Sequence, residues 1–253
     1  MGNNEFNENT RVQVPAALHL CKLGYTYLDN ICAYDTKTNI LIDVFLKAVK
    51  RLNPGLSGSE ASLLYAKIVN IANNDDLGRE FYQLLSANSG TKLIDFENPE
   101  NNDWHVTTEF TCENEDTEDE FRPDITCFVN GLPLAFIEVK KPNNREGILA
   151  ERERINKRMS KSCFRRFFNI TQLMIFSNNQ EYDTDSRVPI QGAFYCCTAK
   201  EKAFFNVFRE EDKRYVLDYP YREITDEMEN KVLKHRNCIV IKNLQEYQTN
   251  KSA

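Results

Sequence analysis

The stretch that decides the fold is FRPDITCFVNGLPLAFIEVK, residues 121–140. Two almost wholly apolar runs flank Asn130 and Gly131, and Asn-Gly is the strongest short signal for a β-hairpin turn. Asp124 precedes the first run, whereas Glu138 and Lys140 end the second. Charged side chains at the ends of such strands are rarely core residues. The stretch therefore predicts a hairpin with a polar site at one end.

Two carboxylates and a lysine are the minimum equipment of a metal-dependent phosphodiesterase. Mg²⁺ prefers carboxylate oxygens and keeps several waters, so Asp124 and Glu138 can hold it from neighbouring strands, with the backbone carbonyl of Val139 as a further ligand. Lys140 follows Glu138 by two residues and points to the same face. There it can lower the pKa of a metal-bound water, position that water or offset charge on the phosphate. The alternative is a structural salt bridge between Lys140 and either carboxylate.

The register of the hairpin offers a test of this site. A strict two-residue loop at Asn130 and Gly131 places Asp124 opposite Ile137, which turns Glu138 to the other face of the sheet. The two carboxylates share a face only if the pairing slips by one residue, through a bulge or a longer turn. We therefore predict such an irregularity.

Length and composition limit the function classes. With 253 residues, the chain can hold one large or two modest domains, and its 41% hydrophobic and 28% charged residues are ordinary for a soluble protein. No apolar run approaches the roughly 20 residues of a membrane span, and the start lacks a secretory signal. The eight cysteines have no CxxC spacing and there are only three histidines, which favours reduced thiols in a cytoplasmic protein over a zinc site.

Charge is uneven along the chain, although the net charge is −6. Residues 113–120 are mostly acidic and are expected to form a solvated loop. The segment 145–166 is strongly basic and could bind DNA within an acidic chain. Local charge therefore leaves nucleic-acid binding open.

Periodicity and turn signals predict the secondary structure. The first 90 residues are expected to be helical, and Ser57 and Glu60 fit a capping box at the start of the third helix. A mixed sheet with a crossing helix should follow, which gives an α/β or α+β fold with helices flanking a central sheet. The expected strands are 104–111, the two runs within 121–140, 172–177, 192–198 and 238–241, and the expected later helices are 144–160, 200–208 and 224–233.

The sequence FRPDITCFVNGLPLAFIEVKKP resembles the core of the PD-(D/E)xK nuclease domain in the R subunit of type I restriction enzymes. The likeness extends to LGY at 23–25, LIDFENP at 93–99, ITQL at 170–173 and HRNCIVIKN at 235–243, so it covers most of residues 12–243. The resemblance implies a restriction-endonuclease-like fold and Mg²⁺-dependent hydrolysis of double-stranded DNA. Asp124, Glu138 and Lys140 then become the nuclease triad, with Asp124, Glu138 and the Val139 carbonyl on the metal.

The resemblance also implies a larger assembly. Such R subunits join modification and specificity subunits, use ATP to translocate DNA and cut far from the recognition site. The chain has no GxxxxGK, so the ATP-binding motor is expected outside it. We expect a helical N-terminal part at 1–90, the nuclease core at 91–218 and a lead-in to the motor at 219–253, with weak or no cutting by the fragment alone. The alternative is a catalytically idle module that docks the motor and guides DNA.

One departure from the family concerns the helix after the lysine. Many members carry Gln-x-x-x-Tyr there, but 144–160 has neither residue. That role is either absent or passed to Arg152, Arg154 or Lys157. With Arg158, these side chains are also candidates for gripping DNA phosphates, with Lys161, Arg165 and Arg166 beyond them. The alternative is a solvated helix with internal Glu–Arg pairs.

An accessory helical glutamate often supplements this nuclease fold. Glu60 is a candidate for that role, although its position in a capping box explains it without function. Glu8 is a weaker candidate.

Overall fold

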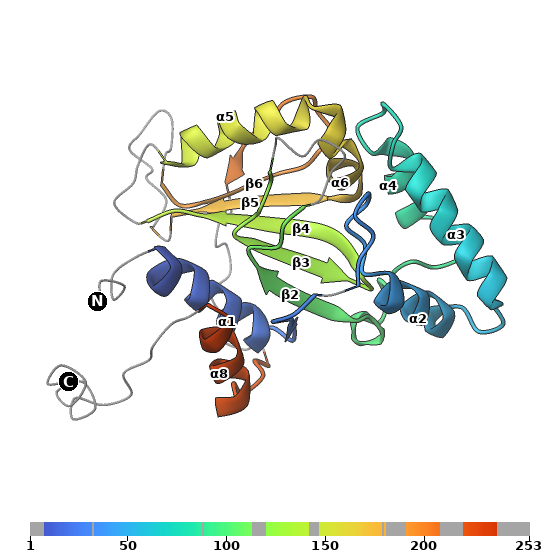
Figure 1. Ribbon diagram of the computed structural model, residues 1–253, viewed down its shortest axis with the longest axis horizontal. Coiled ribbons are helices and arrows are strands. Elements are labelled where there is room, and N and C mark those ends of the chain that lie inside the picture. Colours follow the sequence, from blue (N-terminus) through green and yellow to red (C-terminus); the bar gives the residue numbers. More distant parts are fainter. Residues whose placement is uncertain are drawn as a thin grey trace, which may run out of the picture.

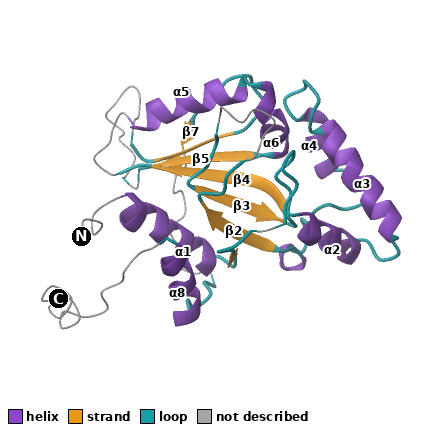
Figure 2. Ribbon diagram, in the orientation of Figure 1, coloured by secondary structure: helices purple, strands orange, loops and turns teal. Residues whose placement is uncertain are grey.

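A mixed β-sheet with helices on both faces and at one end forms the frame of the protein in a computed structural model (Figure 1). Figure 2 shows the strands as one continuous layer between helices. The expected α/β class is therefore confirmed. The structure describes residues 8–31, 33–87, 89–112, 120–141, 147–178, 180, 191–207 and 220–236.

Seven strands of the described residues follow one another across the sheet in chain order. They are β1 (Thr26–Tyr27), β2 (Trp104–Thr108), β3 (Ile125–Val129), β4 (Leu132–Val139), β5 (Leu173–Ser177), β6 (Ala193–Cys196) and β7 (Asn206–Val207). The β1–β2 and β4–β5 pairs are parallel and the others are antiparallel. Parallel neighbours need a long crossover. For β4 and β5 this crossover carries α5 (Gly147–Met159), the short 3₁₀-helix η3 (Ser162–Phe164) and α6 (Arg165–Ile170).

The remaining helices cover the other face and one end of the sheet. A π-helical turn η1 (Asn9–Gln13) leads into α1 (Val14–Lys22), which lies beside α8 (Asp226–His235) below the sheet in Figure 1. The helices α2 (Ile42–Leu52), α3 (Gly58–Ile71) and α4 (Arg79–Leu85) gather at the end where β3 turns into β4, and η2 (Pro99–Asn101) precedes β2. The buried hydrophobic side chains form three clusters. The cluster that is rich in phenylalanine lies under α5 and α6.

The turn of the central hairpin has the geometry that its sequence predicts. Asn130 and Gly131 both have positive φ, 51° and 80°, which is the type I′ conformation that suits the twist of a hairpin. Gly131 also lies against α2: its carbonyl accepts from the Leu41 amide at 2.9 Å, and a Cβ there would come within 2.6 Å of the Leu41 carbonyl oxygen. Only glycine fits this contact.

The predicted slip in the register is confirmed. Next to the turn, Val129 pairs with Leu132 and Phe128 with Pro133, but Cys127 pairs with Ala135, so Leu134 is an extra residue on β4. A bulge of this kind re-aims every side chain beyond it. Pro133 is compatible with the bulge because it has no N–H to donate to the ladder.

Three sequence predictions are wrong in detail. The first 90 residues are not wholly helical, because Thr26–Tyr27 forms β1 and pairs in parallel with β2. The segment 200–208 is not a helix in its described part. Phe205 packs on Phe176 and Phe194 while Phe204 is exposed, and the chain then enters the short strand β7. The strand predicted at 104–111 ends at Thr108, where Glu109 takes a positive φ of 51°. The strand expected at 238–241 and nearly all of the acidic run, 113–119, lie outside the described residues.

Candidate active site

The bulge brings both hairpin carboxylates to one face of the sheet. Beyond it Ile125 pairs with Ile137, and extending this register places Asp124 opposite Glu138. Glu138 lies on the same face as Phe136, which faces α6 and the end of α5. Figure 1 shows this end of β4 next to the first turn of α5 and the start of α1.

Lys140 follows β4 and lies among carboxylates. Its Nζ is 3.8 Å from Asp124 Oδ2, 4.0 Å from Glu138 Oε2 and 3.4 Å from Glu151 Oε2. The same Nζ donates to the backbone carbonyl of Val139 at 2.9 Å, and the Lys140 amide donates to Ser177 on β5. The lysine side chain is therefore fixed from several directions and is only 8% exposed as a residue.

Glu138 lies where ionisation of its carboxyl is unfavourable. It is 5% exposed, and burial, together with the nearby charges of Asp124 and Glu151, raises its pKa well above the ordinary 4.5 despite the opposing effect of Lys140. A hydrogen bond with Asp124 acts in the same direction. Burial and the neighbouring carboxylates thus make the ionised form of Glu138 costly, and a cation beside it would offset that cost.

Lys140 keeps its charge. Burial alone would lower its pKa, but the carboxylates of Asp124, Glu151 and Glu138 outweigh burial and raise the pKa above 10.5. The side chain is therefore an ammonium at neutral pH and acts as an electrostatic group rather than as a base.

The sequence reasoning missed Glu151, which α5 places against the lysine. Glu151 is 1% exposed, and its carboxylate also pairs with Arg154 at 2.6 Å and Arg158 at 3.7 Å. One sequence signal could have found it: Glu151 lies on the apolar stripe formed by Ile148 and Ile155 at helical spacing. Within a run as charged as AERERINKR, that stripe is easily overlooked.

Asp124 is held by backbone and by a second missed residue. The Val139 amide donates to Asp124 Oδ2 at 2.8 Å. Gln13 on η1 is 2% exposed, and its Nε2 donates to the Asp124 backbone carbonyl at 3.0 Å and lies 3.4 Å from Oδ1. These contacts orient the carboxylate without neutralising it.

The donor set fits Mg²⁺. Asp124 and Glu138 supply two carboxylates. The Oε1 atom of Glu138 is buried and has no hydrogen-bond partner, so it can accept a bond from a cation. The Val139 carbonyl accepts one hydrogen bond and retains a lone pair. Among the described residues, no three His, Cys, Asp or Glu side chains form a ready metal cage. Mg²⁺ binds through one or two carboxylates and keeps several waters, which the pair Asp124 and Glu138 can provide.

The two candidates for an accessory glutamate differ in position. Glu60 is exposed and forms the predicted capping box with Ser57, on the helix α3 that Figure 1 places at the opposite end of the sheet from the first turn of α5. Glu8, in contrast, accepts from the Lys141 amide at 3.0 Å and contributes to the raised pKa of Lys140. The structure thus places Glu8 beside the end of the hairpin, whereas Glu60 caps the N-terminus of α3.

The basic candidates on α5 divide into two groups. Arg154 and Arg158 pair with Glu151, and Arg158 also lies 4.4 Å from the ring centroid of Phe121. Arg152 pairs with Glu153 at 3.3 Å, while Lys157 is exposed. The expectation of internal Glu–Arg pairs is therefore met for the three arginines.

Two comparisons with known proteins bear on this arrangement. A family model described as the N terminus of the type I restriction enzyme R protein matches residues 5–184. A protein of Methanocaldococcus jannaschii, provisionally named the endonuclease subunit of type I restriction enzyme MjaIXP, is 32% identical over 165 residues. The match takes in 56% of this chain and 16% of that protein's length.

Among the described residues, no helix is both long and apolar enough to cross a membrane.

Proposed function

Because the chain belongs to the family of type I restriction enzyme R protein N termini, we propose that it is the DNA-cutting domain of such an enzyme. The proposed reaction is Mg²⁺-dependent hydrolysis of phosphodiester bonds in double-stranded DNA. The observation that carries the proposal is the slipped register, which puts Asp124 and Glu138 on one face beside Lys140. A structural salt bridge would need neither the bulge nor a second buried carboxylate.

The chain's own residues have separable roles in this proposal. Asp124 and Glu138 hold the cation, and the Val139 carbonyl is positioned to add an oxygen. A bound Mg²⁺ supplies Lewis acidity toward the phosphate and the attacking water. Lys140, held as an ammonium, offsets the charge that develops on the phosphate.

Glu151 fits a positioning role. When a cation neutralises Asp124 and Glu138, Glu151 remains the lysine's anionic partner, and Arg154 and Arg158 balance its own charge. This arrangement would keep the ammonium in place through the reaction. It also provides a physical substitute on α5 for the missing Gln-x-x-x-Tyr motif.

The setting of the activity is part of the proposal. Modification and specificity subunits would select the DNA, and an ATP-driven motor in another part of the R subunit would deliver it to this domain. The relative from Methanocaldococcus jannaschii is far longer than the matched region, which leaves room for such parts.

The test uses the complete enzyme with Asp124→Asn, which keeps the side-chain shape but removes the charge. Linearisation of a circular plasmid and ATP hydrolysis are measured together. Cutting should fall at least about 100-fold while ATP hydrolysis continues. Asp43→Asn, an exposed position on α2, is the matched control and should cut like the wild type. Unimpaired cutting by Asp124→Asn would favour the idle docking module instead.

A further inference from the structure

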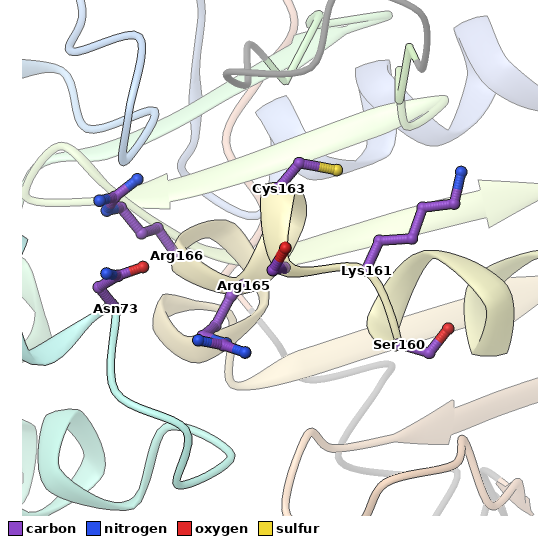
Figure 3. A pocket seen from close by; sticks show the side chains of 7 residues that line it. Asn73, Ser160, Lys161, Cys163, Arg165 and Arg166 are labelled. Atoms are coloured by element: carbon purple, nitrogen blue, oxygen red, sulfur yellow. The ribbon is translucent and has the colours of Figure 1, made fainter.

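A basic cavity of about 810 Å³ lies where α5 ends and η3 and α6 begin, against the end of α3 (Figure 3). Three of its lining side chains are cations and three more offer a hydroxyl or an amide. The lining residues are Asn73, Ser160, Lys161, Ser162, Cys163, Arg165 and Arg166. None of these lining residues, all of them in the described part of the chain, is acidic, and the net charge of the chain is −6. The chemistry of the cavity therefore suits an anion.

One carboxylate among the described residues pairs with a cation of this cavity, and it does so weakly. Asp75 lies 3.7 Å from Arg165, and its side chain is 86% exposed. Exposed ion pairs of this kind contribute little, so a stronger anion can replace Asp75. A neighbouring cavity of about 540 Å³ shares Ser160, Lys161, Ser162 and Arg165 with the first, but it is also lined by Asp75, Glu153 and Glu201, which makes it a poorer anion site.

The cations of the cavity do not converge. Figure 3 shows Lys161 extending to one side, Arg166 to another and Arg165 away from both. A single phosphate ion would be best held by donors aimed at one point, whereas successive phosphates of a nucleic-acid backbone need separated cations. The arrangement favours the second ligand.

The cavity and the candidate active site lie at opposite ends of α5. A helix of 13 residues spans about 20 Å, which equals roughly six base pairs of B-form DNA. Lys157 is exposed on α5 just before the cavity and lines the neighbouring one. One duplex can therefore touch both ends of the helix.

We infer that this cavity grips the DNA backbone about half a helical turn from the phosphate that is cut. The inference rests on the proposed function, since it assumes the same duplex at both places. It assigns Lys161, Arg165 and Arg166 to phosphate binding and leaves catalysis to the hairpin.

The test measures binding of a fluorescent 20-base-pair duplex to the 253-residue chain in EDTA, over a series of salt concentrations. Each phosphate contact contributes about 0.9 to the slope of log K against log salt. Replacing all three cations by alanine should reduce the slope by about 2 to 3. A charge-keeping variant, Arg165→Lys with Arg166→Lys, should retain the wild-type slope, as should Lys67→Ala, an exposed lysine of α3 outside the cavity. Thermal melting verifies that each variant is folded.

Three results would overturn the inference: an unchanged slope in the folded alanine variant, no duplex binding by the wild type at low salt, or displacement of the duplex by inorganic phosphate at constant ionic strength. The last would indicate a site for a small anion. Asp124→Asn separates this inference from the proposed function, because it should reduce cutting by the complete enzyme at least about 100-fold while leaving the slope unchanged. If Asp124→Asn still cuts, the nuclease proposal fails and the slope still decides the cavity.

Discussion

The carboxylate of Glu151 lies 3.4 Å from the ammonium of Lys140, although one residue belongs to α5 and the other follows β4. Both are almost fully buried. The crossover between β4 and β5 thus does more than connect two parallel strands, because it delivers the counter-charge that fixes the lysine.

Removing that counter-charge should destabilise the fold. Glu151→Ala leaves Lys140 short of a buried partner and also unpairs Arg154 and Arg158, and breaking a buried ion pair costs about 3–5 kcal/mol. Urea unfolding of the wild type and the variant measures the difference. Glu153→Ala, two residues along and with a 64% exposed side chain, should change stability by less than about 0.5 kcal/mol. Equal free energies of unfolding for the two variants would show that Glu151 is not the counter-charge that fixes Lys140.

The raised pKa of Glu138 predicts a pH-dependent stability in EDTA. A carboxyl with a raised pKa in the folded state stabilises the fold below its unfolded pKa, near 4.3, and this contribution is lost as pH rises through the folded pKa. The melting temperature of the wild type should therefore fall relative to that of Glu138→Gln as pH rises from about 4.3 through the folded pKa of Glu138. Because protons and cations compete for the same oxygens, Mn²⁺ should bind more tightly over the same rise in pH. Parallel melting curves for wild type and variant would contradict the assignment.

The hairpin turn offers a prediction about stability alone. Gly131→Ala meets both the positive φ of 80° and the carbonyl oxygen of Leu41, the residue before α2, at 2.6 Å, so it should cost more than the about 1–2 kcal/mol of a left-handed alanine. Gly55→Ala is the matched control, since its φ is 99° but nothing lies within 4 Å of the added Cβ. Denaturant unfolding should rank Gly131→Ala as clearly the more damaging of the two.

The two glutamates outside the hairpin should behave differently. Glu60→Ala should lower the melting temperature slightly through loss of the capping box and leave cutting by the complete enzyme unchanged. Glu8→Ala removes the acceptor for the Lys141 amide and should reduce cutting with little change in melting temperature. Reduced cutting by Glu60→Ala, with normal melting, would reverse this assignment.

Local signals carried most of the prediction from sequence. The hairpin, its slipped register and the Ser57–Glu60 capping box depend on residues close together in the chain, and all three are present. The helix expected at 200–208 failed because its hydrophobic residues serve contacts with β5 and β6 that no local pattern reveals. Tertiary packing overrode local propensity there.

In the candidate site, too, local signals reveal some residues and only tertiary packing reveals the others. Asp124, Glu138 and Lys140 could be found because one hairpin carries them. Glu151 and Gln13 could not, since each reaches the hairpin from another element and looks like an ordinary polar residue in its own segment. Their burial within apolar stretches is the signal that sequence reasoning can still use.

The most direct test of the nuclease centre is Lys140→Ala in the complete restriction enzyme, assayed for double-strand cutting of unmodified plasmid with ATP hydrolysis recorded alongside. Loss of the ammonium should reduce cutting at least about 100-fold and leave ATP hydrolysis at the wild-type rate. Cutting at the wild-type rate would contradict the account, and the hairpin would then be a structural element of a docking module.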